Sequence, residues 1–256
     1  QYFNTDTNTT IGKNSHINHA GSENVAIGSD TLKANTSGDS NTSIGVGSLE
    51  SNSSGDHNTA IGYHAGQFNT TASNNTFIGS NTNLAANASW TNSTALGNSA
   101  LITASNEIVL GNSAIAYLRC AETSVSGLSD ARDKKNIQPL TNGIAFVDKL
   151  NPVKFDWNMR DGGKVDIPEM GFIAQELQQV QEEIGITVPG LVRDNDPERL
   201  EAAYGKLLPI FVKAIQDLSG KVTTSESNIT ELETTNAALQ TQIDNIMTIL
   251  NNNNLS

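Results

Sequence analysis

The chain of 256 residues is poor in the residue types that build a large globular core. Only 5% of its residues are aromatic and 36% are hydrophobic, a composition that favours an elongated or oligomeric architecture over one compact domain. Cys120 is the single cysteine, so no disulfide can form within the chain and a multi-cysteine metal site is excluded.

The chain also lacks the features of membrane and nucleic-acid-binding proteins. Its apolar runs fall well short of the ~18 residues that a membrane span requires, so we expect no membrane insertion. The net charge of −12 argues against nucleic acid as a partner, because phosphates select basic surfaces. The first residue is Gln1 rather than Met, and we expect the sequence to be a piece of a longer protein.

Motifs for cofactors and metals are missing as well. The sequence contains no phosphate-binding loop and no cofactor fingerprint, and we predict no cofactor. None of its four histidines stands beside acids or the cysteine at metal-ligand spacing, and we predict no metal. These histidines are His16, His19, His57 and His64.

What the first half does have is a repeat. An Ile/Leu-Gly pair recurs with successive glycines 16, 17, 17, 17, 18 and 14 residues apart. The glycines are Gly12, Gly28, Gly45, Gly62, Gly79, Gly97 and Gly111. In the first five repeats an Asn precedes the glycine by four residues. This period is too short for a helical repeat and indicates one coil of a β-solenoid or β-roll.

The repeat also predicts a role for each of its positions. We expect the Ile to point inward, the Gly to turn the backbone, and the Asn to occupy a tight or left-handed turn. A second apolar residue, such as Leu32 or Leu49, follows the Ile by five positions. One coil buries too little to offset the entropy of ordering it, so stacked coils and several chains are expected to stabilise one another.

Residues 8–111 resemble the head repeats of trimeric autotransporter adhesins, with 58–66 as the best copy. The simplest interpretation of this half is a structural stalk. The alternative is a surface that binds a host receptor or glycan.

The second half begins with a segment of mixed pattern. Residues 142–150 and 173–184 have apolar residues at helical spacing, and the second of these predicts an amphipathic helix. Between them, Val153, Phe155 and Trp157 alternate as in a strand. A further short strand is expected near Leu191. The pattern predicts a small α+β domain over 129–214.

A heptad repeat then runs from Ile215 to Leu250. Its a and d positions are mostly aliphatic, with Asn236 at an a position as a register-setting device. The pattern predicts a coiled coil, and the heptads by themselves fit two strands or three.

The hexapeptide 129–134 stands where the repeat gives way to the mixed segment. It places a serine hydroxyl, Ser129, five residues before an amine, Lys134. A serine needs a base before it attacks an amide, and no histidine follows His64. Lysine serves as such a base only as a neutral amine, and its reference pKa near ~10.4 must therefore fall. Arg132 and Lys135 would favour that fall, whereas Asp130 and Asp133 would oppose it.

Residues 128–137, 151–157 and 171–176 together closely resemble the intramolecular chaperone domain of endosialidase-type phage tail spikes, peptidase family S74. The resemblance implies a homotrimer whose chaperone domain helps an upstream β-rich fibre to fold and then cuts itself off. It implies Ser129 as nucleophile, Lys134 as base, and the Leu128–Ser129 bond as the single-turnover cleavage site. Asp130 and Arg132 would be supporting residues of the motif.

These patterns, together with what the resemblance implies, divide the chain into five parts. They are a β-roll repeat over 1–118, a linker over 119–128, an α+β chaperone and auto-peptidase domain over 129–214, a trimeric coiled coil over 215–250, and a tail over 251–256. The expected protein is the C-terminal part of a phage tail fibre or spike in the virion. The alternative is a non-enzymatic trimeric adhesion fibre, on a virion or a bacterial surface, whose C-terminal domain only clamps three chains together.

Overall fold

The computed structural model describes residues 2–3, 7–15, 21–85, 88–121 and 126–253. The chain divides into two compact units. The first contains residues 1–125, 154–169 and 195–197, and the second contains 126–153, 170–194 and 198–256.

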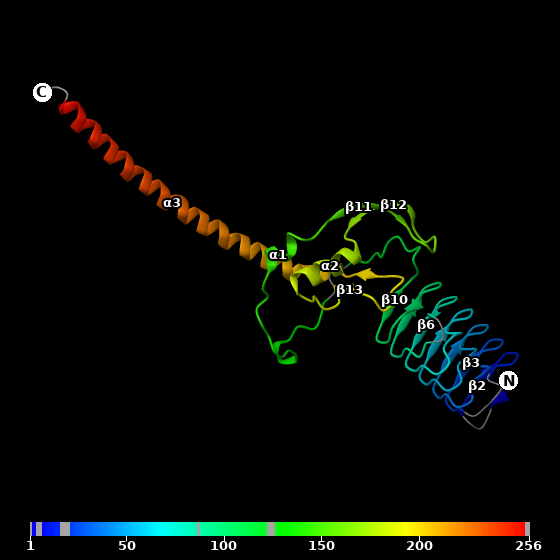
Figure 1. Ribbon diagram of the computed structural model, residues 1–256. Coiled ribbons are helices and arrows are strands. Elements are labelled where there is room, and N and C mark those ends of the chain that lie inside the picture. Colours follow the sequence, from blue (N-terminus) through cyan, green and yellow to red (C-terminus); the bar gives the residue numbers. More distant parts are fainter. Residues whose placement is uncertain (1, 4–6, 16–20, 86–87, 122–125, 254–256) are drawn as a thin grey trace. The chain divides into compact units, whose positions relative to one another are not determined.

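The repeat folds as a β-solenoid, as its period predicts (Figure 1). Its main sheet has the order β1-β2-β3-β4-β5-β6-β8-β10, in which β1 is antiparallel to β2 and the following neighbours are parallel. These strands are β1 (Tyr2–Phe3), β2 (Thr9–Ile11), β3 (Val25–Ile27), β4 (Thr42–Ile44), β5 (Thr59–Ile61), β6 (Thr76–Ile78), β8 (Thr94–Leu96) and β10 (Ile108–Leu110). A second, parallel pair joins β7 (Asn83–Leu84) to β9 (Leu101–Ile102).

The strand isoleucines do not point inward, and that prediction was wrong. Each coil strand has three residues, and in β3, β4, β5, β6 and β8 the middle one is buried while the flanking two lie outside. Ala60 is fully buried, whereas Ile61 is 40% exposed. Side chains alternate along a strand, so an inward middle residue forces both neighbours to the outer face.

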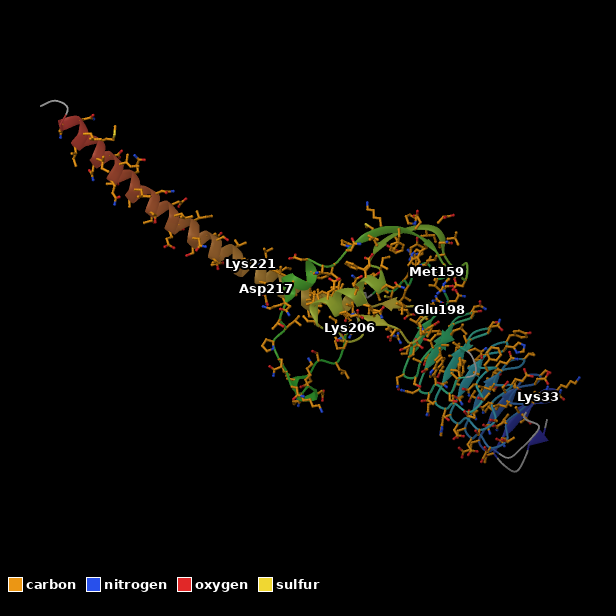
Figure 2. All side chains as sticks on the ribbon, viewed as in Figure 1. Lys33, Met159, Glu198, Lys206, Asp217 and Lys221 are labelled. Atoms are coloured by element: carbon orange, nitrogen blue, oxygen red, sulfur yellow. The ribbon has the colours of Figure 1, made fainter. Side chains whose placement is uncertain are left out.

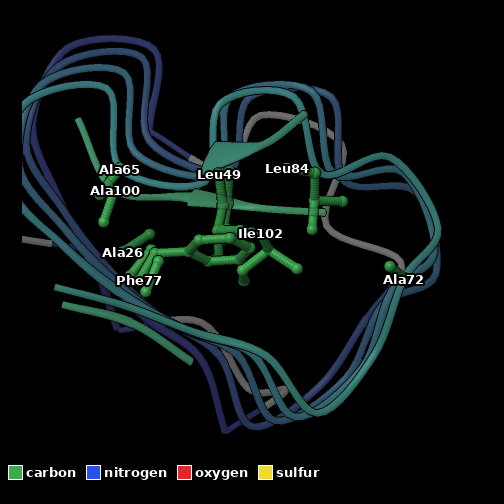
Figure 3. Close-up of a cluster of buried hydrophobic side chains, with 11 residues drawn as sticks. Ala26, Leu49, Ala65, Ala72, Phe77, Leu84, Ala100 and Ile102 are labelled. Atoms are coloured by element: carbon green, nitrogen blue, oxygen red, sulfur yellow. The ribbon is translucent and has the colours of Figure 1, made fainter. Parts of the chain in front are cut away.

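The solenoid core combines residues of the main sheet, such as Phe77 of β6, with residues outside that sheet (Figure 3). Leu49, Phe77 and Ile102 meet in the interior of the coils and are fully buried. The apolar residues five positions after the isoleucine, Leu32 and Leu49, are fully buried.

The repeat glycine turns the backbone, as predicted. Gly12 has a φ of +139°, and a Cβ placed there would lie 2.1 Å from the carbonyl oxygen of Gly28 in the next coil. The position therefore needs glycine both for its backbone angle and for the close stacking of coils.

The repeat asparagines do not occupy left-handed turns, contrary to expectation. Residues just before them have positive φ, for example His57 at 57° before Asn58. Asn58 itself is buried in a ladder of amides: its Nδ2 donates to Asn41 Oδ1 (3.1 Å) and to the carbonyl of Ala72 (2.8 Å). Its Oδ1 accepts from the backbone N–H of Asn75 (3.0 Å). Asparagine is required because its side chain both donates and accepts between coils.

The remaining elements follow the α+β pattern. They are the 3₁₀ helix η1 (Ala131–Asp133), α1 (Gly143–Val147), β11 (Val153–Asn158), β12 (Val165–Gly171), α2 (Ala174–Ile184), β13 (Val192–Arg193), β14 (Glu201–Ala202), the 3₁₀ helix η2 (Tyr204–Leu207) and α3 (Leu208–Asn253). Strand β11 pairs with β12, and β13 pairs antiparallel with β14.

The core of the second unit lies between α1, α2 and the start of α3. Its buried residues are Phe146, Leu177, Val180, Leu191, Leu207 and Ile210. Helix α3 begins seven residues before the predicted heptads, because Leu207 and Ile210 belong to this core.

The rest of α3 lies outside that core. Within the described chain, its side chains beyond Lys221 project with no other element alongside (Figure 2). Its 46 residues make a helix about 69 Å long at ~1.5 Å per residue.

Candidate active site

The hexapeptide 129–134 forms a tight turn around η1 (Ala131–Asp133). Asp130 caps this short helix, because its Oδ1 accepts from the backbone N–H of Arg132 at 2.9 Å. At the other end, the N–H of Lys134 donates to the carbonyl of Ala131 at 3.2 Å. This turn reverses the chain between the serine and the lysine and brings their side chains together.

Lys134 and Ser129 are in direct contact. The Nζ of Lys134 donates to Ser129 Oγ at 2.6 Å and to the carbonyl oxygen of Ser129 at 3.1 Å. At that distance a proton can pass between hydroxyl and amine without movement of the backbone. The second contact has no signature in the sequence, because every residue carries the same backbone acceptor.

Asp130 and Arg132 pair with each other rather than with the lysine. The Nε of Arg132 donates to both carboxylate oxygens of Asp130, at 3.0 and 3.1 Å, and its Nη2 lies 2.5 Å from Oδ2. The side-chain hydrogen bond from Arg132 lowers the pKa of Asp130, and the same bond raises the pKa of Arg132. Asp130 thus pairs with Arg132 and also caps η1, and the pair holds the turn.

The whole segment is surrounded by solvent in the single chain. Every residue from 126 to 142 is exposed, and Leu128 is exposed to the full extent of its side chain. The backbone on both sides of the Leu128–Ser129 bond is therefore open to attack. The same exposure leaves the side chain of Lys134 in contact with solvent.

Potential metal ligands are not clustered elsewhere. Among the described residues, no three or more His, Cys, Asp or Glu side chains are grouped as a metal site would require. His16 and His19 lie outside the described residues, and Cys120 is exposed. In the same described part, no helix is long and apolar enough to cross a bilayer.

Comparison with known proteins points to the same segment. Residues 129–186 match the family model described as the chaperone of endosialidase, Peptidase_S74. These residues are thus similar to the endosialidase chaperone family. The matched segment starts at Ser129, the residue that contacts Lys134, and contains η1, α1, β11, β12 and α2.

Two curated relatives resemble part of the chain. They are the long tail fiber protein Gp37 of Enterobacteria phage K3 and that of Enterobacteria phage T2. Each is 31% identical over 105 residues, which are 40% of this chain but 8% and 7% of the respective relative. The chain thus spans less than a tenth of either protein. No solved structure matched it.

Proposed function

We propose that this chain is part of a phage tail fibre or spike located in the tail of the virion. In this proposal the chaperone domain brings three copies together, assists folding of the solenoid, and then releases itself by cleaving Leu128–Ser129. The tail-fibre relatives and the family match support the fibre and the chaperone. The observation that carries the cleavage step is the 2.6 Å contact between Ser129 Oγ and Lys134 Nζ at the first residue of the family match.

The reaction needs only groups of this segment. Ser129 Oγ attacks the carbonyl carbon of Leu128 while a neutral Lys134 takes its proton. The C–N bond to Ser129 breaks, the lysine returns the proton to the leaving amine, and an ester joins Leu128 to Ser129 Oγ. Water then hydrolyses the ester to a carboxylate at Leu128 and a free hydroxyl at Ser129. Because nucleophile and target are covalently adjacent, effective molarity replaces a substrate pocket.

The amine of Lys134 must be shielded from solvent for this reaction, whereas residues 126–142 are exposed in the single chain. In the proposal, neighbouring copies cover the segment, so that burial favours the neutral amine only in the assembled protein. Cleavage would then follow assembly rather than precede it.

Mass spectrometry of freshly expressed protein tests the cleavage. We expect fragments ending at Leu128 and beginning at Ser129. Ser129→Ala should stay full-length, and so should Lys134→Arg, which keeps the positive charge but cannot act as a base near neutral pH. The matched control is Ser126→Ala, another exposed serine three residues upstream, which should be cut normally.

A fragment beginning at residue 129 in the Ser129→Ala protein would refute the assigned nucleophile. An uncut wild-type chain that is assembled would favour the alternative, a non-enzymatic trimeric fibre with an inactive clamp. The observation that favours this alternative is the exposure of residues 129–134 to solvent.

The chaperone role has a separate test. Residues 1–128 expressed alone should give aggregates or monomers, because three weakly apolar solenoids must find one another before any burial is gained. A heat-resistant trimer from this shortened chain would contradict the chaperone function without bearing on the cleavage.

A further inference from the structure

Two large aliphatic side chains follow the Ser129–Lys134 pair and lie mostly in water. Ile137 is 67% exposed and Leu140 is 41% exposed. Both belong to residues 126–142, here called the motif loop, in which every residue is exposed. In Figure 1 the motif loop (green) projects from the chain before α1. Side chains of this kind gain free energy when another surface covers them.

Ile137 is close enough to Lys134 for one surface to cover both. Three residues separate them along the chain, a span of at most about 11 Å. Pro139 restricts the backbone between Ile137 and Leu140 and favours an extended conformation at Gln138. A surface that accepts Ile137 and Leu140 would therefore also approach the amine of Lys134 and exclude water from it.

The far end of the motif loop is held on α3. Gly143, the residue that follows the loop, lies against the backbone of Ala214. The next heptad residues of α3, Ile215 and Leu218, are 66% and 56% exposed. In the proposed function these residues join the copies. A second copy that packs on them would lie beside the point where the motif loop leaves α3.

The motif loop also differs in charge from the rest of the chain. It contains three basic and two acidic residues, a net charge of +1. The remaining residues are 12 basic and 25 acidic, a net charge of −13. The loop is therefore attracted to the other surfaces of a second copy. This complementarity favours a second copy over a basic or neutral partner.

In the single chain, the charged groups near Lys134 in sequence are those of its own loop. They are Asp130, Arg132, Asp133 and Lys135. Asp130 and Arg132 pair with each other. Since every residue of the loop is exposed, no other element of the described chain covers Lys134. The shielding that the reaction requires must therefore come from outside the single chain.

We propose that Ile137 and Leu140 are positioning residues for the cleavage. They pack against a second copy and thereby shield the amine of Lys134 from solvent. Neither residue transfers a proton, and both act through Lys134, whose neutral form is favoured by burial. The inference rests on the proposed function and adds to it the two residues that link assembly to cleavage.

Time courses of cleavage in the full chain test the proposal. Chains made by cell-free synthesis are stopped in urea and then diluted into buffers between about pH 6 and 10. The variants are Ile137→Ser and Leu140→Ser, with Ile137→Val and Leu140→Ile as conservative replacements. Gln138→Ser, at another exposed position of the motif loop, is the matched control. Gel analysis gives the fraction cut between residues 128 and 129, and light scattering gives the mass in solution.

We expect Ile137→Ser and Leu140→Ser to assemble but to be cut at least several-fold more slowly than wild type near neutral pH. The difference should shrink as the pH approaches the reference pKa of lysine near ~10.4, where an unshielded amine is neutral as well. Ile137→Val, Leu140→Ile and Gln138→Ser should be cut at the wild-type rate. A deficit of the same size at every pH would mean that the two residues only support the fold, and it would overturn the inference.

Other outcomes also overturn it. They are wild-type rates for both serine variants, and serine variants that stay monomeric while Gln138→Ser assembles. Equally fast cleavage in samples dilute enough to contain only monomers overturns it too, because the loop would then dock within its own chain. In each of these cases the wild-type chain is still cut, and the proposed cleavage at Leu128–Ser129 stands. An assembled wild-type chain that is never cut overturns the proposed cleavage and this inference together.

Discussion

Gly143 in α1 lies directly against the backbone of Ala214 in α3. A Cβ built on Gly143 would be 2.4 Å from the amide nitrogen of Ala214 and 2.5 Å from the carbonyl carbon of Lys213. Backbone atoms within a helix cannot move aside as a flexible side chain can, so this glycine sets how closely the two helices approach. The contact joins α1 to the long helix α3.

The Gly143→Ala substitution should therefore separate α1 from α3. We expect a loss of about 1–3 kcal/mol in the free energy of unfolding, the range for overpacking in a tight contact. The control is Gly220→Ala, also on α3, where an added Cβ meets nothing within 4 Å. That variant should gain about 1 kcal/mol from helix propensity. Thermal unfolding followed by circular dichroism measures both, and equal shifts would contradict the packing argument.

The same junction should make stability depend on acid pH. Asp217 on α3 accepts from Lys213 Nζ at 2.5 Å and from the backbone N–H groups of Ile144 and Gly143, and these bonds lower its pKa, that from Lys213 most. A carboxyl whose pKa is lower in the folded state stabilises the fold above its unfolded pKa near ~3.9. That stabilisation is lost as the pH falls through the folded value.

Asp217→Asn should accordingly melt at a lower temperature than wild type at pH 7, and the gap should shrink as the pH falls below about 4. Asp244→Asn, further along the same helix, serves as the control and should follow the wild-type profile. The measurement is the melting temperature of wild type and of both variants between pH 3 and 7. A gap for Asp217→Asn that stays constant over this range would exclude the ionised contact as its cause.

Asn58 should be intolerant of substitution because of its place in the amide ladder. In Asn58→Ala, the carbonyl of Ala72 and the N–H of Asn75 would each lose a buried partner. The expected loss is on the order of 2–5 kcal/mol in the free energy of unfolding. Asn98→Ala removes an exposed amide that bonds to the carbonyl of Ser80 at 3.3 Å, and should cost less than 1 kcal/mol. Comparable losses in denaturant titrations of the two variants would rule out the ladder as a main source of solenoid stability.

Cleavage should leave a fibre that resists unfolding but cannot refold. Once Leu128–Ser129 is cut, the domain that gathers the chains can leave, and the stability of the fibre becomes a matter of its unfolding barrier. Denatured, separated fibre and denatured Ser129→Ala protein should be diluted side by side, and only the latter should recover trimers. Equal recovery would mean that residues 129–256 act as a passive clamp.

Much of the fold was predictable because it depends on local rules. The 14–18-residue spacing of the glycines predicted solenoid coils, since only glycine tolerates the backbone angle and the close approach found at Gly12. Alternation at Val153, Phe155 and Trp157 predicted β11, and the heptads predicted a long helix. The spacing of Ser129 and Lys134 is by itself a weak signal, and the resemblance of 128–137 and the segments after it to a known family singled out the candidate site.

The sequence by itself determined the period of the repeat, the order of the elements and the segment that carries the candidate chemistry. Only the tertiary structure decided which way the repeat residues face. The sequence repeat is the same whether Ile61 faces the interior of the coil or its outer surface. In the structure, the middle strand residue and the amide ladder of Asn58 fill the interior, and Ile61 therefore lies on the outer surface. An inward Ile and an outward Ile have the same spacing, so the choice depends on contacts between coils 17 residues apart. Tertiary structure likewise decided that Arg132 pairs with Asp130 and leaves Lys134 to Ser129, because a sequence lists charges without fixing their partners.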